Sequence, residues 1–172
     1  MSRLSLGTLS FGSDLDERAS HRLLDKAVDY GINSFDTAEL YPAPLKAEHY
    51  GVCEKILGRW LKGKDRSRFF ISSKIAGPED AAEFDIAPWV RGTSRRCSGE
   101  AISQALDGTL ERLQTDYLDL YMIHWPERKI SLDEQINSFM KLTQNKKILS
   151  WGTSNEGPIN MPLLVEHCKK QN

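Results

Sequence analysis

Hydrophobic and polar positions divide the chain into two kinds of segment. Short apolar runs of strand type alternate with longer stretches in which apolar residues recur every three or four positions, as in an amphipathic helix. The strand-type runs are expected at Leu4–Leu9, Ile32–Asp36, Phe69–Lys74, Leu118–His124 and Ile148–Gly152. A segment of helical spacing follows each run. The pattern therefore predicts five strand–helix units in one domain that spans residues 1–172.

Polar residues and glycines mark the expected helix ends. Gly31 supplies a left-handed C-cap position, and Ser98 is a suitable N-cap. Ser131 and Glu134 fit a reciprocal capping box, in which each side chain binds a free helix amide. Between Gly77 and Ser98 the periodicity fails, which predicts a loop of about twenty residues. A loop of that length is expected to shape a pocket.

Strands that alternate with helices indicate a parallel sheet with right-handed crossovers. Two architectures accommodate five such units: an open doubly wound sheet, or part of an eight-stranded (β/α)8 TIM-barrel. A nucleotide-binding doubly wound sheet normally has a glycine-rich turn after its first strand, and Leu9–Gly12 is not such a turn. The sequence therefore favours the α/β barrel type, in which sequential strands are neighbours.

Composition excludes several classes of protein. The 172 residues carry a formal net charge of −1 and spread their lysines and arginines, which argues against a nucleic-acid partner. No apolar run approaches the roughly 20 residues of a membrane span, and no signal-peptide pattern opens the chain. Cys53, Cys97 and Cys168 lack the spacing of a zinc site or redox pair, so we expect reduced thiols, a cytoplasmic location and no metal.

Three successive strand candidates end in titratable residues. Asp36 ends the second, with Tyr41 five residues later; Lys74 ends the third, and His124 the fourth. The carboxyl ends of parallel strands are where α/β proteins build their sites. Taken singly, these residues are more often a cap, a loop anchor, a surface charge and a satisfied histidine. Their placement at adjacent strand ends, on matching faces, predicts a shared site.

Four segments resemble the sequence motifs of the aldo/keto reductases, and they occur in the family's order. The most distinctive is Gly31–Tyr41, and the others are Ser72–Lys74, Leu110–Leu120 running into His124–Pro126, and Gly152–Glu156. The Tyr41–Pro42 turn and the long loop after Lys74 are most similar to the Tas-like branch of that family. The resemblance extends over essentially the whole chain.

The resemblance implies an NAD(P)H-dependent oxidoreductase that reduces aldehyde or ketone carbonyls with a tetrad of Asp36, Tyr41, Lys74 and His124. Tyr41 would donate the proton that the carbonyl oxygen needs. Lys74, held by Asp36, would stabilise the phenolate and so lower the Tyr41 pKa from about 10. His124 would orient the carbonyl by a hydrogen bond.

The same resemblance implies an NADP(H) site and a substrate wall. The expected cofactor contacts are Gly7, Thr8, Asp36, Ser154 and Asn155, the last two holding the nicotinamide carboxamide. Trp125 would lie against a small-molecule carbonyl substrate.

The chain is short for this architecture, because a complete barrel needs about 250 residues, with a range that begins near 200. Strands 6 to 8 and the family's N-terminal hairpin are expected to be missing. Open strand edges and apolar core surface need a cover, so we expect a homo-oligomer or a second subunit. Three hypotheses stay open: the N-terminal part of a reductase, a non-catalytic half-barrel interaction or regulatory protein, and an inactive gene fragment.

Overall fold

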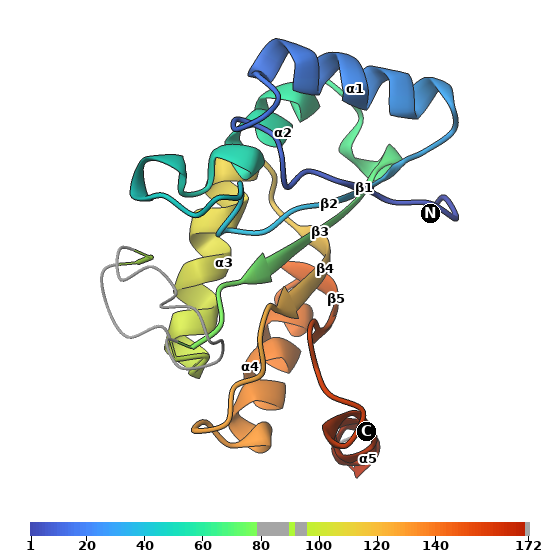
Figure 1. Ribbon diagram of the computed structural model, residues 1–172. Coiled ribbons are helices and arrows are strands. Elements are labelled where there is room, and N and C mark those ends of the chain that lie inside the picture. Colours follow the sequence, from blue (N-terminus) through green and yellow to red (C-terminus); the bar gives the residue numbers. More distant parts are fainter. Residues whose placement is uncertain (79–89, 92–95, 171–172) are drawn as a thin grey trace.

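The computed structural model describes residues 1–78, 90–91 and 96–170. One five-stranded parallel sheet lies along the molecule, with a helix after each strand (Figure 1). The strands are β1 (Leu6–Gly7), β2 (Ser34–Asp36), β3 (Phe70–Ile75), β4 (Leu118–Ile123) and β5 (Ile148–Thr153). The helices are α1 (Glu17–Asp29), α2 (Val52–Leu61), α3 (Gly99–Leu113), α4 (Leu132–Gln144) and α5 (Asn160–Lys170). Two short 3-10 turns cover Ala47–His49 and Arg66–Arg68.

The strand order in space is β1-β2-β3-β4-β5, the same as the order in sequence. A doubly wound sheet reverses its strand order at a switch point, whereas a barrel places sequential strands side by side. The sequential order confirms the predicted five βα units and the barrel type. The register pairs Asp36 with Ser72 and Lys74 with Met122, which confirms that the strand-end residues share one face of the sheet.

Most predicted helix ends are confirmed. Gly31 has a left-handed φ of +78° after α1, and Ser98 Oγ accepts from the amide of Ala101 at the start of α3. Ser131 Oγ accepts from the amide of Glu134 at 3.2 Å, as the capping box requires. The reciprocal half is wrong, because Glu134 Oε1 accepts from the amide of Gly99 on the neighbouring helix. Tertiary contact has replaced the local bond.

The first two strands are shorter than the apolar pattern predicted. β1 was expected over Leu4–Leu9, but Phe11 N binds the carbonyl of Thr8, so a turn begins there. β2 was expected from Ile32, whose amide instead binds the carbonyl of Ala27 at the end of α1. Most of the expected 77–98 loop, and Trp89 within it, lies outside the described residues.

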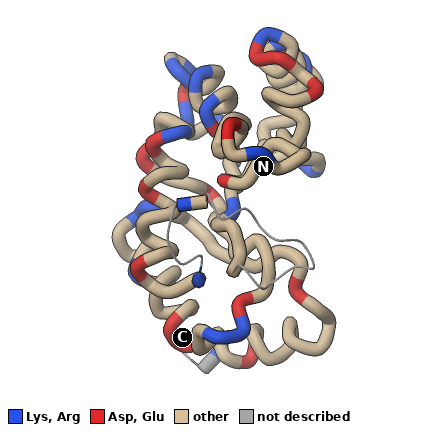
Figure 2. Tube along the Cα trace, turned by 60° about the vertical axis from the view of Figure 1, so that its left-hand side comes forward, with Lys and Arg blue, Asp and Glu red and all other residues tan. Residues whose placement is uncertain are grey.

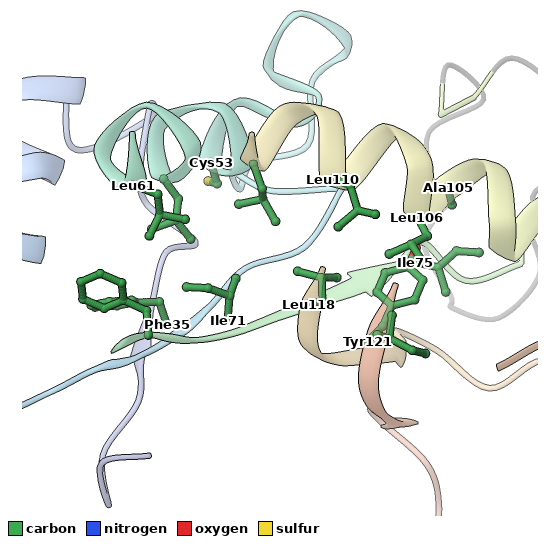
Figure 3. Close-up of a cluster of buried hydrophobic side chains, with 14 of the residues drawn as sticks. Phe35, Cys53, Leu61, Ile71, Ile75, Ala105, Leu106, Leu110, Leu118 and Tyr121 are labelled. Carbon is green, nitrogen blue, oxygen red and sulfur yellow. The ribbon is translucent and has the colours of Figure 1, made fainter. Parts of the chain in front are cut away.

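One face of the sheet packs under the helices and forms the main core. Phe35, Ile71 and Tyr121 project from three neighbouring strands and are fully buried. Figure 3 shows these side chains beneath α2 and α3, facing residues such as Leu106. Full burial of an aliphatic or aromatic side chain contributes about 1.5–3 kcal/mol. We call this the outer face, because the helices of a barrel surround its strands.

The opposite face, here called the inner face, is only partly covered. Leu120 and Met122 of β4 lie on it and are half-buried. The inner face of the half-barrel therefore leaves apolar surface partly open. The outer face is also open at the β5 edge, where Leu149 is 56% exposed and a groove between β5 and α5 is lined by Trp151 and Val165 among others.

The amino ends of β3 and β4 are fixed by a polar clamp. Asp119 Oδ2 accepts from the amide of Ile71 at 2.9 Å and from Arg66 Nη2 at 2.7 Å. Arg66 also donates to the carbonyls of Phe69 and Tyr117. This clamp fixes the β3–β4 register, and so sets Lys74 and His124 on adjacent strands at the other end.

Charged groups are distributed rather than gathered. Over the residues that the structure describes, Lys and Arg are interspersed with Asp and Glu along the helices and loops (Figure 2). Within the same residues, no helix combines the length and the apolar character that a membrane crossing requires.

Candidate active site

Asp36 and Lys74 form a close ion pair at the carboxyl ends of β2 and β3. Lys74 Nζ donates to Asp36 Oδ2 at 2.6 Å and to the carbonyl of Thr37 at 2.8 Å. Ser72 Oγ donates to the other Asp36 oxygen at 2.7 Å. Lys74 is only 5% exposed, and a buried ammonium needs such partners. The ammonium is therefore held in a fixed position on the inner face.

Tyr41 lies over this pair, in the loop that follows β2. The Lys74 ammonium is 5.1 Å from the centroid of the Tyr41 ring. The Tyr41 ring also meets the His124 imidazole edge to face, with centroids 5.7 Å apart and an interplanar angle of 73°. The structure thus brings Asp36, Lys74, Tyr41 and His124 together in one continuous cluster.

His124 follows β4 and is held by main-chain and stacking contacts. Its amide donates to the carbonyl of Ile75 at 3.1 Å, which extends the β3–β4 pairing. The imidazole stacks on Trp125 with centroids 3.9 Å apart. Gly77 passes so close to Trp125 that a Cβ there would lie 2.8 Å from the Trp125 Cβ. The loop after β3 therefore packs directly on the aromatic expected to face substrate.

Burial keeps the His124 imidazole neutral. His124 is 6% exposed, and its Nδ1 has no hydrogen-bond partner among the described residues. Burial first, and the nearby Lys74 charge second, lower the pKa of His124 to about 3. A neutral imidazole has one donating and one accepting nitrogen. The group can therefore hydrogen-bond a carbonyl oxygen without carrying charge.

The net pKa shift of Tyr41 is upward, opposite to the lowering that was expected from Lys74. Burial, with the negative charge of Asp36 as the next cause, raises the pKa of Tyr41 to about 12. The Asp36 carboxylate that fixes the ammonium also opposes formation of a phenolate. Tyr41 is consequently a neutral phenol across the physiological range, the form that can donate a proton.

Gly7 and Thr8 lie beside Asp36 at the end of β1. Gly7 pairs with Asp36 across the sheet, is exposed, and has open space where a Cβ would stand. Thr8 is fully buried, and its amide and hydroxyl both donate to the Asp36 carbonyl, at 2.9 Å and 3.1 Å. The Thr8 hydroxyl thus supports the main chain at Asp36.

Ser154 and Asn155 reach the same rim from the end of β5. Ser154 N donates to the carbonyl of Ile123 at 2.8 Å, continuing the β4–β5 pairing. Asn155 Nδ2 donates to the carbonyl of His124 at 2.8 Å and to Ser154 Oγ at 3.2 Å. Asn155 has a left-handed φ of +56°, which turns the chain at this point. The two polar side chains therefore lie next to His124.

Sequence reasoning missed two buried carboxylates behind the site, Glu39 and Glu54, both 0% exposed. Glu39 stands between Asp36 and Tyr41, and Glu54 lies on the buried side of α2. A charge on a helix face that otherwise reads as core is the signal that could have found Glu54. In the described part of the chain, no group of His, Cys, Asp or Glu has the arrangement of a metal site.

The fold and this cluster define a class: a parallel barrel-type α/β protein with a lysine-backed tyrosine and a neutral histidine at its carboxyl rim. Sequence comparison agrees, because residues 3–170 match the aldo/keto reductase family. The chain belongs to the aldo/keto reductase family.

Individual relatives confirm this assignment. The protein Tas of Escherichia coli K12 is 43% identical over 129 residues, which cover 74% of this chain and 36% of Tas. The aldo-keto reductase AKR11C1 of Bacillus halodurans, in its holo form, matches with a TM-score of 0.73 and 31% identity, over 96% of this chain and 49% of that chain. An aldo-keto reductase of Klebsiella pneumoniae in complex with NADPH matches with a TM-score of 0.71 and 31% identity. The match covers 94% of this chain and 48% of that chain.

The chain thus spans about half the length of these solved relatives, and less of Tas. The matched half contains the whole tetrad predicted from the sequence.

Proposed function

We propose that the site reduces aldehyde or ketone carbonyls, with Tyr41 as proton donor. The observation that carries this proposal is the contact of a neutral Tyr41 with both the Lys74–Asp36 ion pair and the neutral His124. Hydride addition to a carbonyl carbon leaves negative charge on the oxygen, which then needs a proton and a polarising neighbour. The cluster supplies both functions.

In the proposed step, the carbonyl oxygen lies between Tyr41 and His124. As the carbon–hydride bond forms and the carbonyl π bond breaks, the oxygen takes the phenolic proton of Tyr41. His124 donates a hydrogen bond that orients the oxygen. The Lys74 ammonium stabilises the phenolate that remains, and Asp36 keeps that ammonium in place. Trp125 would form a wall of the substrate site.

NADP(H) is the proposed cofactor, and it would supply the hydride. The support is the Klebsiella pneumoniae relative, which is in complex with NADPH. The residues present suit this role: Gly7 leaves open space, and Asn155 and Ser154 place polar groups beside His124. We propose that Ser154 and Asn155 hold the carboxamide, with Gly7, Thr8 and Asp36 as further contacts.

The proposed setting is a single domain of residues 1–172 in the cytoplasm. All three cysteines are free, and Cys53 and Cys97 are buried, which suits a reducing compartment.

A fluorescence titration of the purified chain with NADPH, paired with the mass of the native particle, tests the proposal. Saturable quenching that NADH reproduces less well is the expected result. Asn155→Ala should weaken NADPH binding. The matched control is Asn145→Ala, which should leave binding unchanged because Asn145 caps the end of α4. Absence of saturable binding in a particle of any mass would contradict the cofactor assignment.

A second function, as a half-barrel that binds another subunit or a second copy of itself, is favoured by a different observation. The inner face leaves Met122 half-buried, and the outer side of the β5 edge leaves Leu149 and Val165 exposed. Exposed apolar surface of this kind marks an interaction site. A stable stoichiometric complex without NADPH binding, unaffected by Tyr41→Phe, would favour this function over the reductase.

A further inference from the structure

Glu39 lies outside the tetrad, two residues before Tyr41, and its side chain is fully buried. A buried carboxylate is costly unless several donors surround it. Glu39 has such donors, and each comes from a different part of the fold. Its contacts therefore indicate what the residue holds together.

The two carboxylate oxygens of Glu39 have separate partners. Oε1 accepts from the amide of Ala76, at 2.5 Å, and from Arg91 Nη1. Oε2 accepts from the hydroxyl of Tyr50 at 2.9 Å. Burial raises the pKa of Glu39, and the Arg91 guanidinium opposes that shift. One side chain thus joins the segment after β3, Arg91, and the end of the loop of residues 39–51, here called the Tyr41 loop.

The main chain of Glu39 makes the same connections. Its amide donates to the carbonyl of Lys74 at 3.2 Å, and its carbonyl accepts from the amide of Gly51 at 3.1 Å. Both ends of the loop from 39 to 51 therefore converge on Glu39. Tyr41 lies inside that closed loop, and Lys74 lies one hydrogen bond away from it.

Tyr50 connects this anchor to the helices. The Arg112 guanidinium of α3 lies 5.1 Å from the centroid of the Tyr50 ring and also binds Glu54 Oε2 at 2.6 Å. Glu54 is as deeply buried as Glu39, but its other partner is Ser73 Oγ on the outer face, at 2.6 Å. The two carboxylates share an environment, and only Glu39 is bonded to the Tyr41 loop.

We propose that Glu39 is a positioning residue for proton transfer: it fixes the Tyr41 loop to the carboxyl end of β3, and so sets the phenol against Lys74 and His124. The effect on turnover rests on the proposed reductase function, but the geometric effect does not. Misplacement of a reacting group by about 1 Å costs about 10²-fold in rate. Removing the Glu39 charge should therefore move Tyr41 without touching any tetrad residue.

The test compares Glu39→Gln with Glu54→Gln in the full chain, using proton NMR contacts between the Tyr41 and His124 rings. Glu39→Gln should lose these contacts and should exchange the Gly51 amide about tenfold faster or more. Glu54→Gln should keep the ring contacts, although it removes an equally buried carboxylate. With NADPH and an aldehyde, Glu39→Gln should lower kcat about 10²-fold with little change in KM.

Ring contacts retained in Glu39→Gln, or lost equally in both variants, would overturn the proposal. If Glu39→Gln does not fold, Tyr50→Phe removes one Glu39 donor and decides instead. Weakened ring contacts in Tyr50→Phe support the proposal, and unchanged ones overturn it. The predicted ring contacts together with no carbonyl reduction in any variant would contradict the reductase function and leave the positioning role in place.

Discussion

The two faces of the sheet differ in how completely their side chains are buried. On the outer face, Ile71 and Tyr121 are fully buried beneath α2 and α3, and Glu54 is fully paired there. On the inner face, Leu120 and Met122 stay half-buried beside the candidate site. Both faces belong to the same strands. The outer face is thus covered over β2 to β4, whereas the inner face stays partly open at the same strands.

The candidate site follows the same division. Asp36 and Lys74 are fixed by bonds to neighbouring strands, and His124 is buried against Trp125. Asn155, at the β5 end, is exposed. Proton-transfer geometry therefore comes from strands that the outer-face core holds in place. Two of the proposed cofactor contacts, Ser154 and Asn155, lie at the open β5 end, so substitutions there should affect cofactor binding more than proton transfer.

The largest difference in unfolding free energy should come from removing a buried charge on the outer face. Glu54→Gln leaves the 13% exposed Arg112 side chain without its anion and should cost about 3–5 kcal/mol of unfolding free energy. Its matched control is Glu17→Gln, because Glu17 pairs with Arg59 at the surface and should contribute only about 0–1 kcal/mol. Urea unfolding of both variants measures the difference. Equal losses would mean that the buried Glu54–Arg112 pair contributes no more to stability than an exposed surface pair.

The next largest difference in stability should come from shortening an apolar side chain on each face. Ile71→Ala removes a fully buried outer-face side chain and should cost about 2–5 kcal/mol. Leu120→Ala removes a half-buried inner-face side chain and should cost under about 1.5 kcal/mol. The same denaturant titration measures both. A loss for Leu120→Ala as large as that for Ile71→Ala would show that the inner face is covered in solution, and native mass would then identify an oligomer.

A difference that appears only at acid pH concerns the single histidine of the site. The pKa of His124 is about 3 in the folded chain and 6.5 as the reference value, so below about 6.5 the unfolded state binds a proton that the native state does not. Stability should therefore fall as pH drops from 6.5 toward 3, by up to about 1.4 kcal/mol per pH unit. Melting curves between about pH 7 and about pH 5 should show a shallower slope in His124→Asn. Identical slopes would mean that water reaches His124 on the inner face.

Much of this division could be predicted from the sequence. The near-continuous apolar run of β4 gave its bounds and placed His124 at its end, because strands of parallel sheets have few polar positions. Strand periodicity also placed Asp36 and Lys74 on one face. Gly7, Ser154 and Asn155 entered through family resemblance alone.

Other features could not be predicted, because they depend on contacts between distant segments. The pKa of Tyr41 depends on burial and on Asp36, which act through the folded chain and outweigh the expected effect of Lys74. Glu134 binds Gly99, a residue far away in sequence, rather than completing its own capping box. The donors that surround Glu39 come from three separate segments. Local sequence patterns therefore locate strand ends, but they do not predict which distant residues contact one another there.

Carbonyl reduction by the native chain and by Tyr41→Phe, followed as oxidation of NADPH in the presence of an aldehyde, decides whether Tyr41 is the proton donor. We expect turnover in the native chain and a loss of about 10²–10⁴-fold in Tyr41→Phe, because the substitution removes the proton donor and leaves the ring in place. Equal rates in the two proteins, zero included, would contradict it.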